Sequence, residues 1–175
     1  MNYAKIILIA TSMLVLSGCS SSNVKSYKAD YATFAYLRTG ATPVMNIGTI
    51  TVPKGDTNSI MCRMVGNVYL PNKMTYSQYL REALHKVLVT ADKFDDTGKA
   101  AHTLSIELTS VTFSSVGGEW IIDGHLIIDS KSPKHVKTVT KFGTAFDAGS
   151  ACHNAAGAFD EAVTDFVKET LSQVK

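Results

Sequence analysis

Few of the patterns that carry chemistry occur in this chain. Its 175 residues include three cysteines and five histidines, and none of these falls into the CxxC, HxxxH or HExxH spacing that is typical of zinc sites. The GxSxG pattern of serine hydrolases is absent as well. Lysine and arginine total 17 against 15 aspartate and glutamate residues, without a basic stripe or a nucleic-acid-binding motif. We therefore expect no metal, no other cofactor, no nucleic-acid partner and no enzymatic activity.

Long hydrophobic runs are also scarce, and the clearest one lies at the N-terminus. Lys5 precedes an apolar stretch from Ile6 to Leu16, which is too short to cross the ~30 Å hydrocarbon core of a bilayer as a helix. A cationic start followed by a short apolar run is typical of a secretory signal. Residues 1–18 are therefore predicted to be a signal peptide that is removed, and the rest is long enough for one domain with its own core.

The predicted signal peptide ends in a short motif, Leu16-Ser17-Gly18-Cys19. It resembles the lipobox of bacterial lipoproteins, which implies that diacylglycerol is attached to the Cys19 sulfur and that cleavage follows just before this residue. Two or three acyl chains anchor a protein stably, because each buried CH₂ contributes ~0.8 kcal/mol. A chance cysteine after an ordinary signal, or a buried helix at residues 6–16, is the alternative.

The residue after the motif bears on the choice of membrane. Ser20 stands where the lipoprotein pattern would place an aspartate to retain the protein in the inner membrane. The resemblance therefore implies the outer membrane, with the protein held by lipid on Cys19 and facing the periplasm.

Cys62 and Cys152 are the two thiols left once Cys19 carries lipid. In an exported protein an even pair of cysteines predicts a disulfide. Two free buried thiols and two ligands of a metal site are the alternatives, although a metal site needs three or four ligands.

The chain after the signal is predicted to comprise a tether and one domain. Residues 19–26 form the lipidated tether, because the serine-rich stretch after Cys19 has the composition of a flexible spacer. Residues 27–175 are then a single domain. Between Tyr27 and Gly40 aromatic residues recur without a helical or strand period, which predicts an irregular segment that wraps the domain.

The remaining sequence predicts two helices and five strands. In chain order we expect a strand at 44–52, a weaker strand at 60–70, a helix from Thr75 to about Lys93, three strands between residues 104 and 146, and a last helix from Asp147. This order is typical of an α+β fold, in which a mostly antiparallel sheet is covered on one face by two amphipathic helices.

Local patterns refine this prediction at three places. Thr75 and Gln78 have the spacing of a capping box at the start of the first helix. The apolar alternation shifts parity near Thr109–Ser110, which indicates a β-bulge. The last strand is expected to place Phe142 and Phe146 on its core face.

Three apolar residues are expected on the outer, otherwise polar face of the sheet. These are Ile121, Ile127 and Val139. Exposed apolar residues gathered on one face indicate a partner surface or self-association.

A catalytic use of the same face is a weaker hypothesis. It rests on Glu107, Asp123 and His125, which are expected on the outer face. Glu107 should lie opposite His125, and Asp123 should lie opposite Lys141. Such cross-strand pairs stabilise a sheet surface without any catalytic role.

Several of these features together resemble a known family. The lipobox, the helix containing Tyr79-Leu80-Arg81-Glu82-Ala83-Leu84, the strand Leu104-Ser-Ile-Glu-Leu108 and the terminal helix are similar to uncharacterised envelope lipoproteins of the YajG type. The order of elements also resembles the accessory lipoproteins of lipid-transport systems. The resemblance implies a non-enzymatic binding, assembly or accessory subunit with a protein partner in the envelope. A carrier of lipid or cell-wall fragments is the alternative.

Overall fold

The computed structural model describes residues 21–40, 42–52, 55–97 and 99–174. The predicted signal peptide and the motif from Leu16 to Cys19 lie outside the described residues. Among the residues that are described, no helix has both the length and the apolarity that crossing a membrane requires.

The larger sheet has four strands in the order β2-β5-β6-β7. They are β2 (Met45–Thr51), β5 (His102–Ser114), β6 (Glu119–Ile128) and β7 (Lys134–Lys141). Both β5–β6 and β6–β7 are antiparallel, whereas β2 and β5 are parallel. The sheet is therefore mixed, because the chain crosses over through the helix α2 between β2 and β5, as parallel neighbours require.

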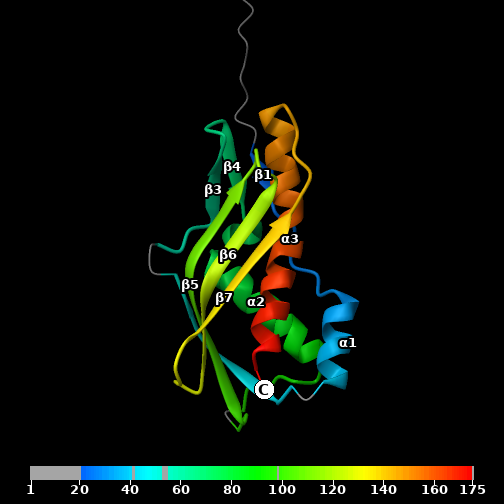
Figure 1. Cartoon of the computed structure of the whole chain (residues 1–175), viewed down its shortest axis with the longest axis vertical. Helices are drawn as coiled ribbons and strands as arrows, with labels where there is room; N and C mark the ends of the chain where they lie inside the picture. The colour runs from blue at the N-terminus through cyan, green and yellow to red at the C-terminus, as the bar shows by residue number, and fades with distance from the viewer. Residues whose placement is uncertain (1–20, 41, 53–54, 98, 175) are drawn as a thin grey trace, which may run out of the picture.

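Three helices accompany this sheet. They are α1 (Tyr31–Thr39), α2 (Tyr76–Thr90) and α3 (Ala148–Ser172). In Figure 1 the strands β5, β6 and β7 lie in front of α2 and α3, so the two long helices share one side of the sheet. The predicted α+β class, with two amphipathic helices on one face, is confirmed.

A smaller sheet of three short strands stands beside the first. Its order is β1-β4-β3, formed by β1 (Ser22–Asn23), β4 (Gly66–Tyr69) and β3 (Ser59–Cys62). A short 3₁₀ helix (Pro71–Lys73) then leads from β4 toward α2. The weak strand predicted at residues 60–70 is thus a hairpin of two strands. Arg63 and Met64 turn the chain between them with φ of 46° and 56°.

Both long helices begin with a side-chain cap, and the sequence predicts the one at Thr75. The Thr75 side chain accepts a hydrogen bond from the Gln78 backbone N–H, and the Gln78 side chain accepts one from the Thr75 N–H at 2.9 Å. Asp147 caps α3 by accepting from the Ser150 N–H at 2.7 Å. Such caps satisfy backbone donors that have no partner within the helix, and they fix where each helix starts.

The predicted bulge is present in β5. Leu108 pairs with Gly124 and Ser110 with Asp123, so Thr109 is the extra residue. The bulge brings the two backbones close together, since a Cβ on Gly124 would stand 2.8 Å from the Glu107 carbonyl oxygen. A glycine is therefore required opposite the bulge.

The core is centred where β6 meets the two long helices. Trp120 is buried, its ring centroid lies 4.7 Å from that of Phe159, and its indole N–H donates to the Ala155 carbonyl oxygen at 2.7 Å. Phe159 also packs against Tyr79 of α2, with 5.2 Å between the ring centroids. Buried alanines on α3, including Ala151, let this helix lie close to the sheet.

The predicted disulfide joins the two halves of the domain. Cys62 and Cys152 are bonded, with their Cα atoms 6.0 Å apart and a sequence separation of 90. The bond ties the end of β3 to the first turn of α3.

The N-terminal part of the domain differs from the prediction. Ser22–Asn23 forms β1, which pairs in parallel with β4, and Val24 is buried in the core. Residues 22–24 of the segment predicted as a flexible tether are therefore structured. Residues 31–39, predicted to be irregular, form α1 instead. Propensity predicts both segments poorly, because each is stabilised by residues distant in sequence.

The last strand also differs from the prediction. Asp123 pairs with Lys137 and not with Lys141, because the turn at Asp129 and Ser130 closes earlier than expected. The strand ends at Lys141, so Phe142 is only partly buried and Phe146 is fully exposed. The predicted place of Phe146 in the core is wrong.

Removing the disulfide should lower stability strongly. Since the bridge closes a loop of 90 residues, the chain-entropy model gives a loss of about 4–5 kcal/mol in the free energy of unfolding for the double variant Cys62→Ala/Cys152→Ala. Urea unfolding measures this loss. The reduced wild-type protein is the control, because it loses the bond but keeps both sulfurs. A loss below about 1 kcal/mol in both samples would contradict the expectation.

Candidate interaction surface

The outer face of the four-stranded sheet carries the residues that the sequence singled out. Ile121, Asp123, His125 and Ile127 alternate along β6 with buried residues, and each of these four is half-buried. Val139 projects from the same face of β7 and is 48% exposed. The prediction that these side chains share one face is confirmed.

The strand pairing brings two of the three apolar candidates together. Ile121 lies directly opposite Val139, whereas Ile127 pairs with Ser105 of β5. At ~3.3 Å per residue, Ile127 stands about 20 Å from Ile121 along β6. The apolar patch on this face is therefore Ile121 with Val139, and Ile127 is separate from it.

A polar network occupies the middle of the same face. One oxygen of the Asp123 carboxylate accepts hydrogen bonds from the Thr109 hydroxyl at 2.8 Å and from His135 Nε2 at 2.9 Å. The ring of His135 lies 5.6 Å from that of His125, and Glu107 is opposite His125 in the strand register, as predicted. His135 is the member that the sequence reading missed, since only the true register of β7 brings it to Asp123.

The electrostatics of this network identify Asp123 as a charged structural acceptor. Burial raises the pKa of Asp123, but hydrogen bonds from Thr109 and His135 outweigh it, and the net pKa lies below the ordinary value. A general base works best with a pKa near the operating pH, so a lowered pKa does not favour that role. Among the described residues, no three acidic, histidine or cysteine side chains are grouped as a metal site would require.

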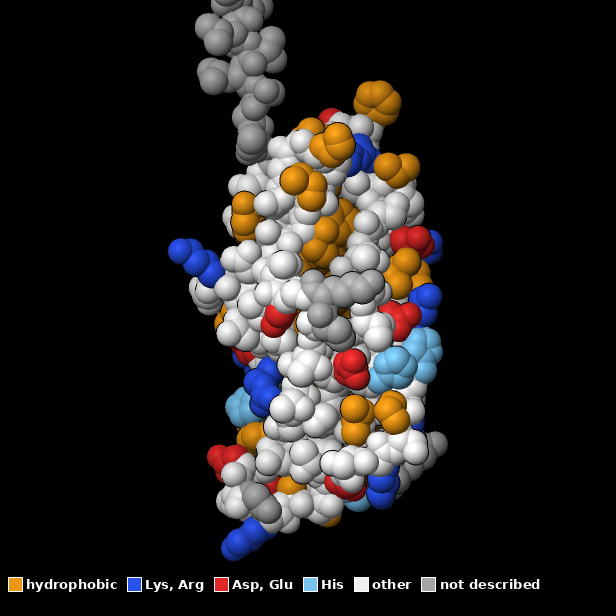
Figure 2. Space-filling model, turned by 90° about the vertical axis from the view of Figure 1, so that its left-hand side faces the viewer, with side chains coloured by type: hydrophobic (Ala, Val, Ile, Leu, Met, Phe, Trp, Pro, Cys, Tyr) orange, Lys and Arg blue, Asp and Glu red, His pale blue; other side chains and the backbone are white. Residues whose placement is uncertain are grey.

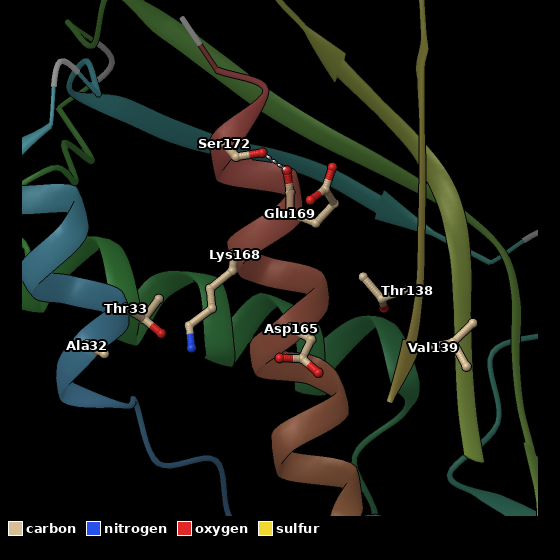
Figure 3. A pocket seen from close by; sticks show the side chains of 8 residues that line it. All are labelled: Ala32, Thr33, Thr138, Val139, Asp165, Lys168, Glu169 and Ser172. Atoms are coloured by element: carbon tan, nitrogen blue, oxygen red, sulfur yellow. Dashed lines mark hydrogen bonds between the residues drawn. The ribbon is translucent and has the colours of Figure 1, made fainter. Parts of the chain in front are cut away.

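A groove beside β7 continues the apolar patch toward the helices. It has a volume of about 500 Å³ and is lined by residues of β7, α3 and α1, namely Ala32, Thr33, Thr138, Val139, Asp165, Lys168, Glu169 and Ser172. Val139 belongs both to the outer face and to this groove. Figure 3 shows that Asp165, Lys168, Glu169 and Ser172 all project from α3, with Ala32 and Thr33 on the neighbouring α1.

Polar side chains border the groove, and some of them are held in place by hydrogen bonds within the chain. Asp165 accepts a hydrogen bond from the Thr140 hydroxyl at 2.6 Å, and Lys168 donates to Asp30 at 3.1 Å. The hydroxyl of Thr138 is buried and has no hydrogen-bond partner among the described atoms. Charged walls and an unpartnered hydroxyl suit a ligand that brings polar groups of its own.

The groove also runs along an edge of the sheet. β7 is the last strand in the order and forms its ladder with β6 alone within the described chain. The other side of an edge strand presents backbone N–H and C=O groups that can pair with an added strand. Patch, groove and strand edge are contiguous, and together they form the candidate interaction surface.

Comparison with known proteins identifies a solved structure with a similar fold. The structure is similar to the crystal structure of protein XCC0632 from Xanthomonas campestris, described as a DUF330 protein, with a TM-score of 0.52 and 11% sequence identity. The similarity covers 87% of this chain and 94% of that chain. No family model matches the sequence, and no curated protein does. At this level of identity the comparison establishes a shared fold.

The α1 side of the groove was missed at the level of sequence. Asp30 immediately precedes α1, and its side chain accepts a hydrogen bond from the Thr33 hydroxyl at 3.2 Å. An aspartate followed three residues later by threonine is a weak helix-start signal, which the aperiodic aromatics of this segment obscured. Only the tertiary structure, in which Ala32 and Thr33 line the groove and Asp30 pairs with Lys168, shows that α1 is a wall of the groove.

Loss of Asp30 should loosen α1. The Lys168 ammonium, followed by the Ala32 backbone N–H, lowers the pKa of Asp30 from 3.8. The carboxylate therefore stabilises the folded state above this value and stops doing so as pH falls through the lowered pKa. In Asp30→Ala, amides of α1 should exchange hydrogen faster than in the wild type at neutral pH, with exchange in the sheet unchanged.

The matched control for this experiment is Arg38→Ala. It removes an ion pair to Asp92 in which both side chains are mostly exposed, and such pairs contribute little. Equal exchange of α1 in Asp30→Ala and in the wild type would show that the capping and pairing of Asp30 do not hold this helix.

Proposed function

We propose that this protein is an outer-membrane lipoprotein that acts as a non-enzymatic binding or assembly subunit in the cell envelope. The proposal includes the resemblance to YajG-type lipoproteins, an anchor on Cys19 and a periplasm-facing domain. The shared fold with a DUF330 protein supports it. The bond between Cys62 and Cys152 supports an exported location, since structural disulfides persist in oxidising compartments.

The observation that carries the binding role is the contiguous surface at β7. Ile121 and Val139 form an apolar centre, and the groove behind Val139 adds charged side chains around it. Protein interfaces commonly combine an apolar centre with a polar rim. The free edge of β7 adds the option of pairing with a strand of the partner.

The same structure favours a protein partner over a lipid cargo. The layer between sheet and helices is filled by large side chains such as Trp120, Tyr79 and Phe159, all buried. An acyl chain would have to displace them, and the groove outside this layer is bordered by Asp165, Lys168 and Glu169. Desolvating these charged groups against an alkyl chain would be costly.

Crosslinking from β7 tests the partner surface. A photoreactive amino acid at position 139 should capture a defined envelope protein in intact cells. In the background of Ile121→Asp, the yield should fall at least tenfold, because hot-spot residues at the centre of an interface contribute about 2 kcal/mol or more. Circular dichroism checks that the variant is folded.

The matched control for Ile121→Asp is Val89→Asp. Val89 is 47% exposed on α2, close to the exposure of Val139, but it lies outside the candidate interaction surface. Equal crosslinking yields in the two aspartate variants would contradict the proposal. Loss of an envelope activity in a folded His125→Ala variant would also contradict the proposal, because it would indicate an enzyme. Lipid that co-purifies with the protein in native mass spectrometry would contradict it as well, because it would indicate a carrier.

Anchoring is predicted to depend on Cys19. Because this sulfur is the expected site of diacylglycerol attachment, a Cys19→Ser variant should carry no acyl chains and should accumulate as unprocessed precursor. Mass spectrometry and membrane fractionation measure both outcomes. Mature-length Cys19→Ser protein in the outer-membrane fraction would contradict the lipobox assignment.

A further inference from the structure

Five of the exposed large apolar side chains gather at one end of the molecule. They are Met61, Met64, Val65, Val116 and Phe146, and they define the apolar tip. Met64 is 88% exposed, Val116 76%, and Phe146 fully exposed. Figure 2 shows hydrophobic side chains concentrated toward this end of the face.

Three loops build the apolar tip, and they come from distant parts of the chain. One is the β3–β4 turn, one is the β5–β6 turn, and one leads from β7 to α3. Figure 1 shows all three at the same end of the molecule. The apolar side chains therefore converge because of the tertiary fold and do not follow from one hydrophobic run.

Arg63 holds the three loops together. Its guanidinium donates to the Ser115 hydroxyl at 3.1 Å and to the Ser115 carbonyl oxygen at 2.9 Å. It also donates to the carbonyl oxygens of Ala145 and Phe146, at 3.2 and 3.1 Å. The neighbouring disulfide fixes Cys62 to α3. The loops are thus braced to present apolar side chains outward.

Two charged side chains beside the apolar tip, those of Arg63 and Asp147, are already paired within the chain. Arg63 donates four hydrogen bonds to its own chain. The Asp147 carboxylate accepts a hydrogen bond from the Ser150 backbone N–H at the start of α3. Moving a surface toward hydrocarbon is costly when polar groups lose water without gaining partners. Internal pairing reduces that cost at this end of the molecule.

The described chain begins at the same end. β1 runs parallel to β4, and Ser22 pairs with Val68, which lies only two residues beyond the start of β4 at Gly66. Two peptide links separate Cys19 from Ser21, which limits the distance between their Cα atoms to about 7 Å. A lipid anchor on Cys19 would hold the apolar tip next to the bilayer.

We infer that the apolar tip inserts into the interfacial region of the bilayer that holds the acylated Cys19. The inference rests on the proposed lipid anchor. Phe146 and Met64 then exchange water for lipid, so the domain has two attachments to the membrane instead of one flexible link. Two attachments fix orientation, and α3 extends away from the bilayer with Lys168 about 30 Å from its first residue.

Tryptophan quenching in vesicles tests the insertion. Mature, acylated Phe146→Trp protein is reconstituted into vesicles of phospholipid with brominated acyl chains, and its emission is compared with that in unbrominated vesicles. The added tryptophan should lose most of its emission. Buried Trp120 supplies a constant background that the wild-type protein measures, and Val116→Trp should repeat the result from a second loop.

Tyr31→Trp is the matched control. Tyr31 is 75% exposed on α1, a helix that Figure 1 shows in the half of the molecule away from the apolar tip, so its tryptophan should keep its emission in both lipids. Equal quenching at positions 31 and 146 in acylated, vesicle-bound protein would overturn the inference. The absence of quenching at both positions 116 and 146 would also overturn it. A crosslink from residue 146 to an envelope protein or to a second copy of this chain would then identify what covers the apolar tip instead.

The mass of the mature protein separates this inference from the proposed function. A chain without acyl groups on Cys19 would overturn both the anchor and the insertion. Acylated Phe146→Trp and Val116→Trp proteins whose added tryptophans both remain unquenched would overturn the insertion alone.

Discussion

The packing of α3 along the inner face of the sheet sets the geometry of the whole domain. Buried alanines on its first turns, Ala151 and Ala155 among them, allow a close approach to β6. There the Trp120 indole N–H finds its acceptor in the Ala155 carbonyl oxygen. A buried indole donor without a partner would be destabilising, so this contact specifies where the helix lies as well as holding it there.

The two ends of α3 serve two different surfaces. Its first turn carries the disulfide to the β3–β4 hairpin, and the loop before it contributes Phe146 to the apolar tip. Its last turns carry Asp165 and Lys168, which border the groove beside β7. One rigid helix therefore separates the apolar tip, which we propose contacts lipid, from the surface that we propose binds a protein. This separation would let a subunit stay at the membrane while it engages a partner farther away.

The polar outer face shows why residue types alone are weak evidence for catalysis. Glu107, Asp123 and His125 share a face, as an active site would require, yet Asp123 accepts hydrogen bonds from its own chain and has a lowered pKa. Such pairing stabilises neighbouring strands. The fold relationship to a DUF330 protein carries no chemistry by itself, since one fold can host unrelated functions.

What the sequence by itself determined is local or periodic. The capping box at Thr75, the bulge at Thr109, the alternation along β6 and the two amphipathic helices depend on residues near one another in the chain. The pairing of Cys62 with Cys152 was predictable for a different reason, because the sequence predicts an exported chain whose Cys19 carries lipid, which leaves only these two thiols to join.

What only the tertiary structure decided involves distant partners. The parallel pairing of β2 with β5, the strand at Ser22 and the register of β7 each depend on a neighbour that no local pattern specifies. Phe146 illustrates the limit most clearly. Its sequence context predicts a core residue, but the strand ends at Lys141 because the preceding turn closes early, and this shift leaves the ring exposed at the apolar tip.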